Sequence, residues 1–136
     1  MKRAFVMTAI FATATAAAAQ QFTTAAEVKP ILSATRDNWV ALRDYGGHDL
    51  IYFTQLEAWR CGLKGISYSV NGQPAVVYKA EPCHEGSAQP NAMTLKAHLP
   101  YLEFPEGSVK TLTVKLTYDD GSTDQAHFAR KDVLMP

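Results

Sequence analysis

Residues 111–118 alternate polar and apolar side chains without interruption, and this pattern limits the possible folds more than any other part of the chain. The apolar positions are Leu112, Val114, Leu116 and Tyr118. Successive side chains of a strand point to opposite faces, so these four share one face. The segment therefore predicts a long strand with one side packed on a core.

The loop after this strand sets the register of the strand that follows. Residues 119–121, Asp-Asp-Gly, are turn formers. A two-residue loop would place core positions opposite polar ones. A three-residue loop with Gly121 in a left-handed conformation pairs Val114 with Ala126 and Leu112 with Phe128 instead. We therefore predict the three-residue loop.

A second hairpin is centred on Asn71-Gly72. Residues 66–70 alternate in polarity, and residues 75–78 resume the strand pattern. Asn-Gly tolerates the two positive φ angles of a type I′ turn, whose twist matches the flanking strands. A two-residue loop predicts the pairs Val70 with Gln73, Tyr68 with Ala75 and Ile66 with Val77.

Short apolar runs elsewhere in the chain favour further strands. They are Glu27–Ser33, Val40–Tyr45, Leu50–Thr54 and a short one at Met93–Ala97. Residues 81–91 are expected to form an irregular connection, and residues 99–107 a crossover bounded by prolines.

Residues 54–64 fit either a helix or a strand. Thr54 to Glu57 matches a capping box, and Leu56, Trp59 and Leu63 recur at helical spacing. Gly62, however, leaves room for only about two helical turns. We prefer a continued strand.

About seven short strands without a long helix predict an all-β (mainly β) fold, namely a small single-domain β-sandwich over residues 27–136. Residues 111–128, a strand, turn and strand, resemble the closing hairpin of bacterial immunoglobulin-like or fibronectin-like domains. That resemblance implies the fold alone, because such sandwiches carry unrelated functions.

The N-terminus has the layout of a cleaved secretory signal. Lys2 and Arg3 precede an uncharged, Ala-rich run that ends in Ala17-Ala18-Ala19. The apolar run is too short to span a bilayer, and small residues precede the expected cleavage site. We predict removal of residues 1–19, a loose leader at residues 20–26, and a periplasmic or secreted protein. An uncleaved signal acting as an anchor is the alternative.

Charge and hydropathy exclude two classes of partner for the mature chain. The signal carries two of the thirteen basic residues and none of the thirteen acidic ones, so the mature net charge is −2. No stretch concentrates Lys or Arg as a nucleic-acid interface would. No second apolar run is long enough to cross a membrane.

Cys61 and Cys83 are the two cysteines, and an oxidising compartment favours a bond between them. A thiol or metal pair is the alternative. Cys83, His84, Glu85 and the later Met93 are ligand types of a copper site, but such a site needs Cys83 as a thiolate. We expect a structural disulfide, no metal and no cofactor.

Catalysis would have to be assembled from histidines near carboxylates. His48 precedes Asp49, His84 precedes Glu85, and His127 lies near the C-terminus. Neither Gly-x-Ser-x-Gly nor His-Glu-x-x-His occurs in the sequence. We assign no catalytic residue and favour a non-enzyme.

The expected function is therefore binding. Aromatic side chains on a sandwich face stack on sugars or anchor a protein partner. Tyr45 and Tyr101 lie beside turn residues and are the candidate binding aromatics. We predict a binding or accessory module for an envelope protein or a saccharide. A small periplasmic hydrolase with a His/carboxylate pair, or a weak metal-binding protein, is the alternative.

Overall fold

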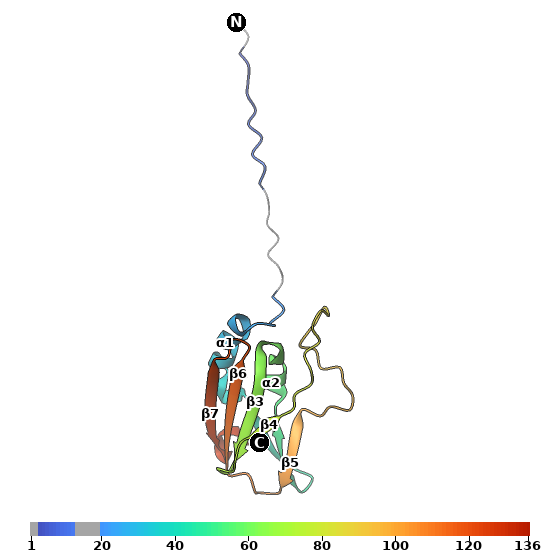
Figure 1. Ribbon diagram of the computed structural model, residues 1–136, viewed down its shortest axis with the longest axis vertical. Coiled ribbons are helices and arrows are strands. Elements are labelled where there is room, and N and C mark those ends of the chain that lie inside the picture. Colours follow the sequence, from blue (N-terminus) through green and yellow to red (C-terminus); the bar gives the residue numbers. More distant parts are fainter. Residues whose placement is uncertain (1–2, 13–19) are drawn as a thin grey trace.

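The computed structural model describes residues 3–12 and 20–136, and its elements from residue 25 onward gather into one body (Figure 1). In chain order the elements are α1 (Ala25–Ala34), the 3₁₀ turn η1 (Arg36–Asn38), β1 (Ala41–Tyr45), β2 (His48–Tyr52), α2 (Thr54–Glu57), the 3₁₀ turn η2 (Arg60–Gly62), β3 (Leu63–Val70), β4 (Val76–Tyr78), β5 (Tyr101–Pro105), β6 (Thr111–Tyr118), β7 (Thr123–Ala129) and α3 (Arg130–Val133). The predicted signal cleavage site falls at residues 13–19, which lie outside the described residues.

The strands form two antiparallel sheets. One has the order β1-β2-β5 and the other the order β4-β3-β6-β7. With seven strands and one disulfide among its described residues, the protein is mainly β, as the sequence predicts. Both sheets contribute to one core, in which Leu42 and Ile51 of the first sheet join Val114 and Leu116 of the second.

The closing hairpin forms with the predicted register. Leu112 lies opposite Phe128 and Val114 opposite Ala126. Gly121 has a φ of 83°, so it takes the left-handed conformation that a three-residue loop requires. The alternation in β6 thus specifies both the buried face and the loop.

The hairpin at Asn71-Gly72 has the predicted turn but a different register. Both turn residues have positive φ, 54° and 72°, as a type I′ turn demands. Ile66 nevertheless pairs with Tyr78, one residue beyond the predicted Val77. Pro74 follows the turn and has no N–H to continue the ladder, so the strand resumes late. Tyr78 is therefore buried and Val77 is 70% exposed.

The predicted strand Glu27–Ser33 is wrong, because these residues belong to α1. The hydroxyl of Thr24 accepts from the N–H of Glu27 and caps the helix. Val28 and Leu32 are fully buried, four residues apart on one helical face. The helix takes up residues 25 and 26 of the expected leader as well.

Three predictions between residues 54 and 107 also need correction. The strand preferred for residues 54–64 begins only at residue 63, in β3, because residues 54–62 contain the short helix α2 and the turn η2. Residues 99–107, expected to be a crossover, contain β5. The strand expected at Met93–Ala97 does not form, since the N–H groups of Thr94 and Leu95 donate to the buried carboxylate of Glu81. The strands expected at Val40–Tyr45 and Leu50–Thr54 correspond to β1 and β2.

An ion pair joins β2 to the end of the chain. Asp49 is fully buried and accepts from both terminal nitrogens of Arg130, at 2.6 and 3.1 Å. It also accepts from the N–H groups of Gly107 and Val109, each at 3.0 Å. The Arg130 hydrogen bonds, opposed by burial and helped by these N–H groups, lower the pKa of Asp49 to about 2.

The left-handed conformation of Gly121 gives a stability prediction with a matched control. A Cβ added at Gly121 or at Gly65 would meet no atom within 4 Å, but only Gly121 of the two has a positive φ. Gly121→Ala should lower the free energy of unfolding by about 1 kcal/mol, and Gly65→Ala should not lower it. Urea unfolding measures both values. Equal losses would contradict the loop conformation.

Asp49 predicts an acid-dependent loss of stability. Its folded-state pKa of about 2 lies below its ordinary value of 3.8, so its stabilisation is complete above about pH 4 and is lost as the pH falls towards 2. As the pH falls from about 4 to 2, the free energy of unfolding of Asp49→Asn should decrease by about 1 to 2 kcal/mol less than that of the wild type. Unfolding free energies at several pH values test this. Asp37→Asn, the same substitution on the exposed turn η1, is the matched control for the exchange of an aspartate for an asparagine.

Candidate functional site

The two predicted binding aromatics lie at opposite ends of the first sheet. Tyr45 ends β1 at the hairpin, is 59% exposed and has the Arg43 guanidinium 4.1 Å from its ring centre. Tyr101 begins β5, opposite Tyr52 at the end of β2. The structure therefore does not bring Tyr45 and Tyr101 into one site.

Tyr101 does belong to an aromatic pair. Its ring centre lies 5.3 Å from that of Tyr52, with the planes inclined by 50°. Both residues are half-buried. Because β2 and β5 are hydrogen-bonded neighbours, the backbone fixes the relative position of the two rings.

Tyr52 also lines a depression of about 350 Å³. Its lining residues are Asn38, Trp39, Val40, Ala41, Tyr52, Thr54, Gln55 and Met135. None of these carries a charge. Within residues 20–136, the structure gives no side-chain hydrogen bond to Asn38, Thr54 or Gln55, so their amides and hydroxyl are available to a ligand.

The predicted disulfide forms between Cys61 of η2 and Cys83, which follows β4. It closes a loop with a sequence separation of 22 residues. Cys61 is buried, while Cys83 is half-buried. The bond ties the long connection between β4 and β5 to the short helical segment before β3.

Arg60, beside the disulfide, holds the same connection by hydrogen bonds. Its side chain is 3% exposed. The guanidinium donates to the backbone carbonyls of Glu57, Glu81, Pro82, Asn91 and Ala92. It also pairs with the Glu81 carboxylate at 3.2 Å. One buried cation thus joins α2 to both ends of residues 81–92.

Glu81 also binds residues further along the same connection between β4 and β5. Its buried carboxylate accepts from the N–H groups of Thr94 and Leu95, at 3.1 and 2.8 Å. Burial alone would raise its pKa, but these N–H groups, His84 and Arg60 together lower the pKa of Glu81 to about 2. The carboxylate therefore stays ionised at neutral pH.

Glu57 is the second buried carboxylate beside Arg60, and it contacts a histidine. It accepts from the Tyr78 hydroxyl at 2.8 Å and from the N–H of Glu81 at 2.7 Å. Nε2 of His98 lies 2.7 Å from Oε1 of Glu57, the oxygen that also accepts from the N–H of Glu81. Burial, then the bond to Glu57, raises the pKa of Tyr78 far above its ordinary value, so the phenol keeps its proton.

His98 lies at a second depression, of about 290 Å³, between β4 and the start of β5. Val77 and Leu99, 70% and 55% exposed, line it together with Lys79 and Leu102. A carboxylate-bound imidazole in a depression has the arrangement of an acid-base catalyst.

The other histidines do not complete a catalytic group. His84 approaches Glu81 at 2.6 Å and the Thr94 hydroxyl at 3.1 Å, but both contacts use Nε2. A relay from hydroxyl to carboxylate needs the two different ring nitrogens, so this trio is not a hydrolytic triad. His48 contacts the carbonyl of Gly46, and His127 contacts Thr113.

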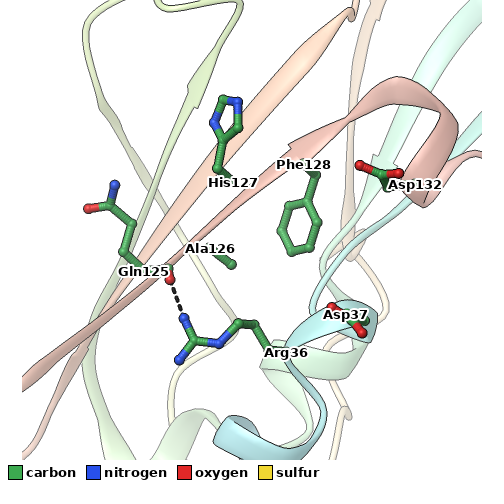
Figure 2. A pocket seen from close by; sticks show the side chains of 7 residues that line it. All are labelled: Arg36, Asp37, Gln125, Ala126, His127, Phe128 and Asp132. Carbon is green, nitrogen blue, oxygen red and sulfur yellow. Dashed lines mark hydrogen bonds between the residues drawn. The ribbon is translucent and has the colours of Figure 1, made fainter.

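The depression drawn in Figure 2, of about 540 Å³, lies along the edge strand β7. Arg36 donates to the carbonyl of Gln125 and pairs with Asp124 at 2.6 Å. Figure 2 shows His127 and Phe128 on opposite sides of β7. Arg36 thus provides a hydrogen-bond donor for the Gln125 carbonyl of the edge strand, and its positive charge is already paired with Asp124.

Neither a metal cluster nor a membrane helix occurs in the described part of the chain. No three of its His, Cys, Asp and Glu residues are grouped to hold a metal ion. None of its helices is long and apolar enough to cross a bilayer. Cys83, the best ligand of the alternative copper site, is in the disulfide.

Comparison with family models, curated proteins and solved structures finds no match to this chain.

Sequence reasoning found the disulfide but missed the buried charges around it. Glu57, Arg60, Glu81 and His98 come from three separate segments, and no spacing along the chain links them. One signal is available in the sequence. Arg60 is next to Cys61 and Glu81 is close to Cys83, so a disulfide between the two cysteines brings Arg60 near Glu81. The neutral depression at Tyr52 has no signal in the sequence, because its lining comes from three separate segments, residues 38–41, 52–55 and Met135.

Arg60 and Arg36 give a matched pair of stability predictions. Arg60→Met leaves the Glu81 carboxylate buried without its cation and should cost about 3 to 5 kcal/mol of unfolding free energy. Arg36→Met removes an ion pair whose arginine is 42% exposed and should cost about 1 kcal/mol or less. Chemical denaturation of both variants provides the measurement. A small loss in both would show that Arg60 does not anchor the connection.

Proposed function

We propose that this protein is an exported, non-enzymatic binding module whose ligand is a neutral saccharide. The Tyr52–Tyr101 pair beside an uncharged depression carries this proposal. Export is supported by the basic start and Ala-rich run of residues 2–19, and the disulfide is compatible with it. The mature module would work in the periplasm or outside the cell.

An immunoglobulin-like or fibronectin-like sandwich is the fold we propose for this module. The sheet β1-β2-β5 has the order of strands A, B and E of such domains, and β4-β3-β6-β7 that of C′, C, F and G. Tyr68 of β3 and Phe104 of β5 meet at 6.5 Å between ring centres, which supports face-to-face packing of the sheets.

The chemistry of the depression matches a sugar ring. A sugar has apolar C–H faces, which stack on aromatic rings, and hydroxyl groups, which both donate and accept hydrogen bonds. Tyr52 supplies an aromatic ring, while the Asn38 and Gln55 amides supply donors and acceptors. The volume of about 350 Å³ is near the lower end of ligand sites, which suits one or two sugar units.

The uncharged lining of the depression favours a neutral ligand over a charged one. An anionic sugar or an acidic peptide would need Lys or Arg at the site, and none of the described residues in the lining is charged. A protein partner would favour a broad, exposed aromatic surface, but Tyr45 lies at the other end of the sheet.

A hydrolase is the second candidate, and the His98–Glu57 contact favours it. Glu57 would orient the imidazole, and the other ring nitrogen would act as a base at the depression beside Val77. This reaction would need water or a substrate hydroxyl as nucleophile. His98→Gln should abolish any hydrolysis of esters or glycosides, whereas it should leave saccharide binding at Tyr52 unchanged.

Saccharide binding is tested with the mature protein and neutral probes. Titration with glucose oligomers and N-acetylglucosamine oligomers, followed by two-dimensional NMR, should shift the backbone signals of residues 38–41 and 52–55. Tyr52→Leu should weaken binding about fivefold, because stacking on an aromatic ring contributes about 1 kcal/mol. Gln55→Ala should also weaken it.

Tyr45→Leu provides the matched control, since it makes the same substitution at the opposite end of the sheet. It should leave the affinity unchanged. If none of the oligomers shifts these signals, or if Tyr45→Leu weakens binding as much as Tyr52→Leu, the proposed site is wrong.

A further inference from the structure

The first described residues of the domain are held against it rather than extending freely. The Phe22 ring packs edge-on against Trp59, with 5.0 Å between ring centres. The Asn91 side-chain amide donates to the carbonyls of Gln21 and Phe22, at 3.3 and 3.0 Å. The N–H of Phe22 donates to Glu27 at 3.1 Å. Residues 21 and 22 are thus anchored to both α1 and the β4–β5 connection.

Gln20 lies just outside this anchor. It is exposed, and it borders a depression of about 400 Å³ that Trp59, Pro90 and Ala92 also line. In residues 20–136, no hydrogen bond holds the Gln20 side chain. Its amide carbon is therefore free to approach its own backbone nitrogen.

We propose that Gln20 is a modification site and that the mature chain begins with pyroglutamate. This inference rests on the proposed export, because cleavage after Ala19 is what frees the Gln20 α-amino group. The amine lone pair attacks the side-chain amide carbon, and a five-membered lactam forms. The C–N bond to the side-chain amide nitrogen breaks, and that nitrogen leaves as ammonia with the displaced proton. No oxidant or co-substrate is consumed.

The anchor gives this modification a structural consequence. An α-ammonium group needs water around it, whereas a lactam is uncharged and packs on apolar surface at a lower cost. All the residues that line the depression are uncharged, so it favours a neutral group over an ammonium group. Cyclisation therefore suits the start of the chain to the surface on which residues 21 and 22 already lie.

Mass spectrometry of the full chain, expressed with its own residues 1–19 and recovered from the envelope or medium, tests this proposal. We expect an N-terminal peptide that begins at residue 20 and is one ammonia lighter than the encoded sequence. A protein that begins at Gln20 with a free amine would overturn the modification and leave export standing. A chain that begins at Met1 would overturn both, and a start at Gln21 would overturn the assignment to Gln20.

A second preparation separates the chemistry from the export machinery. The chain is released in vitro with Gln20 first, by a protease that cuts after a fused tag, and its mass is followed at neutral pH. The wild type should lose one ammonia per chain and become resistant to aminopeptidase. Gln20→Ser, prepared in parallel, should keep its mass and stay sensitive. If the wild type keeps its mass over days at 37 °C and remains sensitive, Gln20 is not such a site.

Discussion

The arrangement of the protein around the disulfide depends on one buried cation, Arg60. Five backbone carbonyls accept from its guanidinium, and four of them belong to residues 81–92. That stretch has no strand of its own to satisfy its carbonyls, so a side chain must do so where it is buried. A planar guanidinium with several N–H donors suits this task better than a lysine ammonium. The hydrogen bonds of the Arg60 side chain therefore order this connection, where a β-sheet would use hydrogen bonds between backbone groups.

The disulfide and Arg60 act on the same segments in different ways. The bond between Cys61 and Cys83 restricts the unfolded chain, whereas Arg60 contributes in the folded state. Arg60 also makes the buried carboxylates possible. Glu81 is ionised beside it, and Glu57 then accepts from the N–H of Glu81 and from Tyr78. His98 lies at the partly exposed side of this network, where Glu57 fixes its ring. The network thus orders both the core and a surface group.

Local sequence patterns predicted the parts of the fold that local physics decides. Leu112 and Phe128 pair as expected because strict alternation and Gly121 leave one register. The pattern predicts Val77 opposite Ile66, because nothing in it shows that Pro74 delays the strand. The apolar run of residues 27–33 predicts a strand, although Val28 and Leu32 have helical spacing and Thr24 is a capping residue. The contacts of Arg60 could not be predicted, since its partners are mainly backbone carbonyls, which every residue has.

β2 connects the stability of the domain to its proposed site. At one end, Asp49 is held by Arg130 and by the loop before β6. At the other end, the N–H of Phe53 donates to the carbonyl of Pro100 at 2.7 Å, directly beside Tyr52 and Tyr101. Because β2 is the central strand of its sheet and is fixed at both ends, the two tyrosines do not need to be ordered when a ligand arrives. Weak, neutral ligands such as sugars gain little per contact, so a site already in place is what allows them to bind.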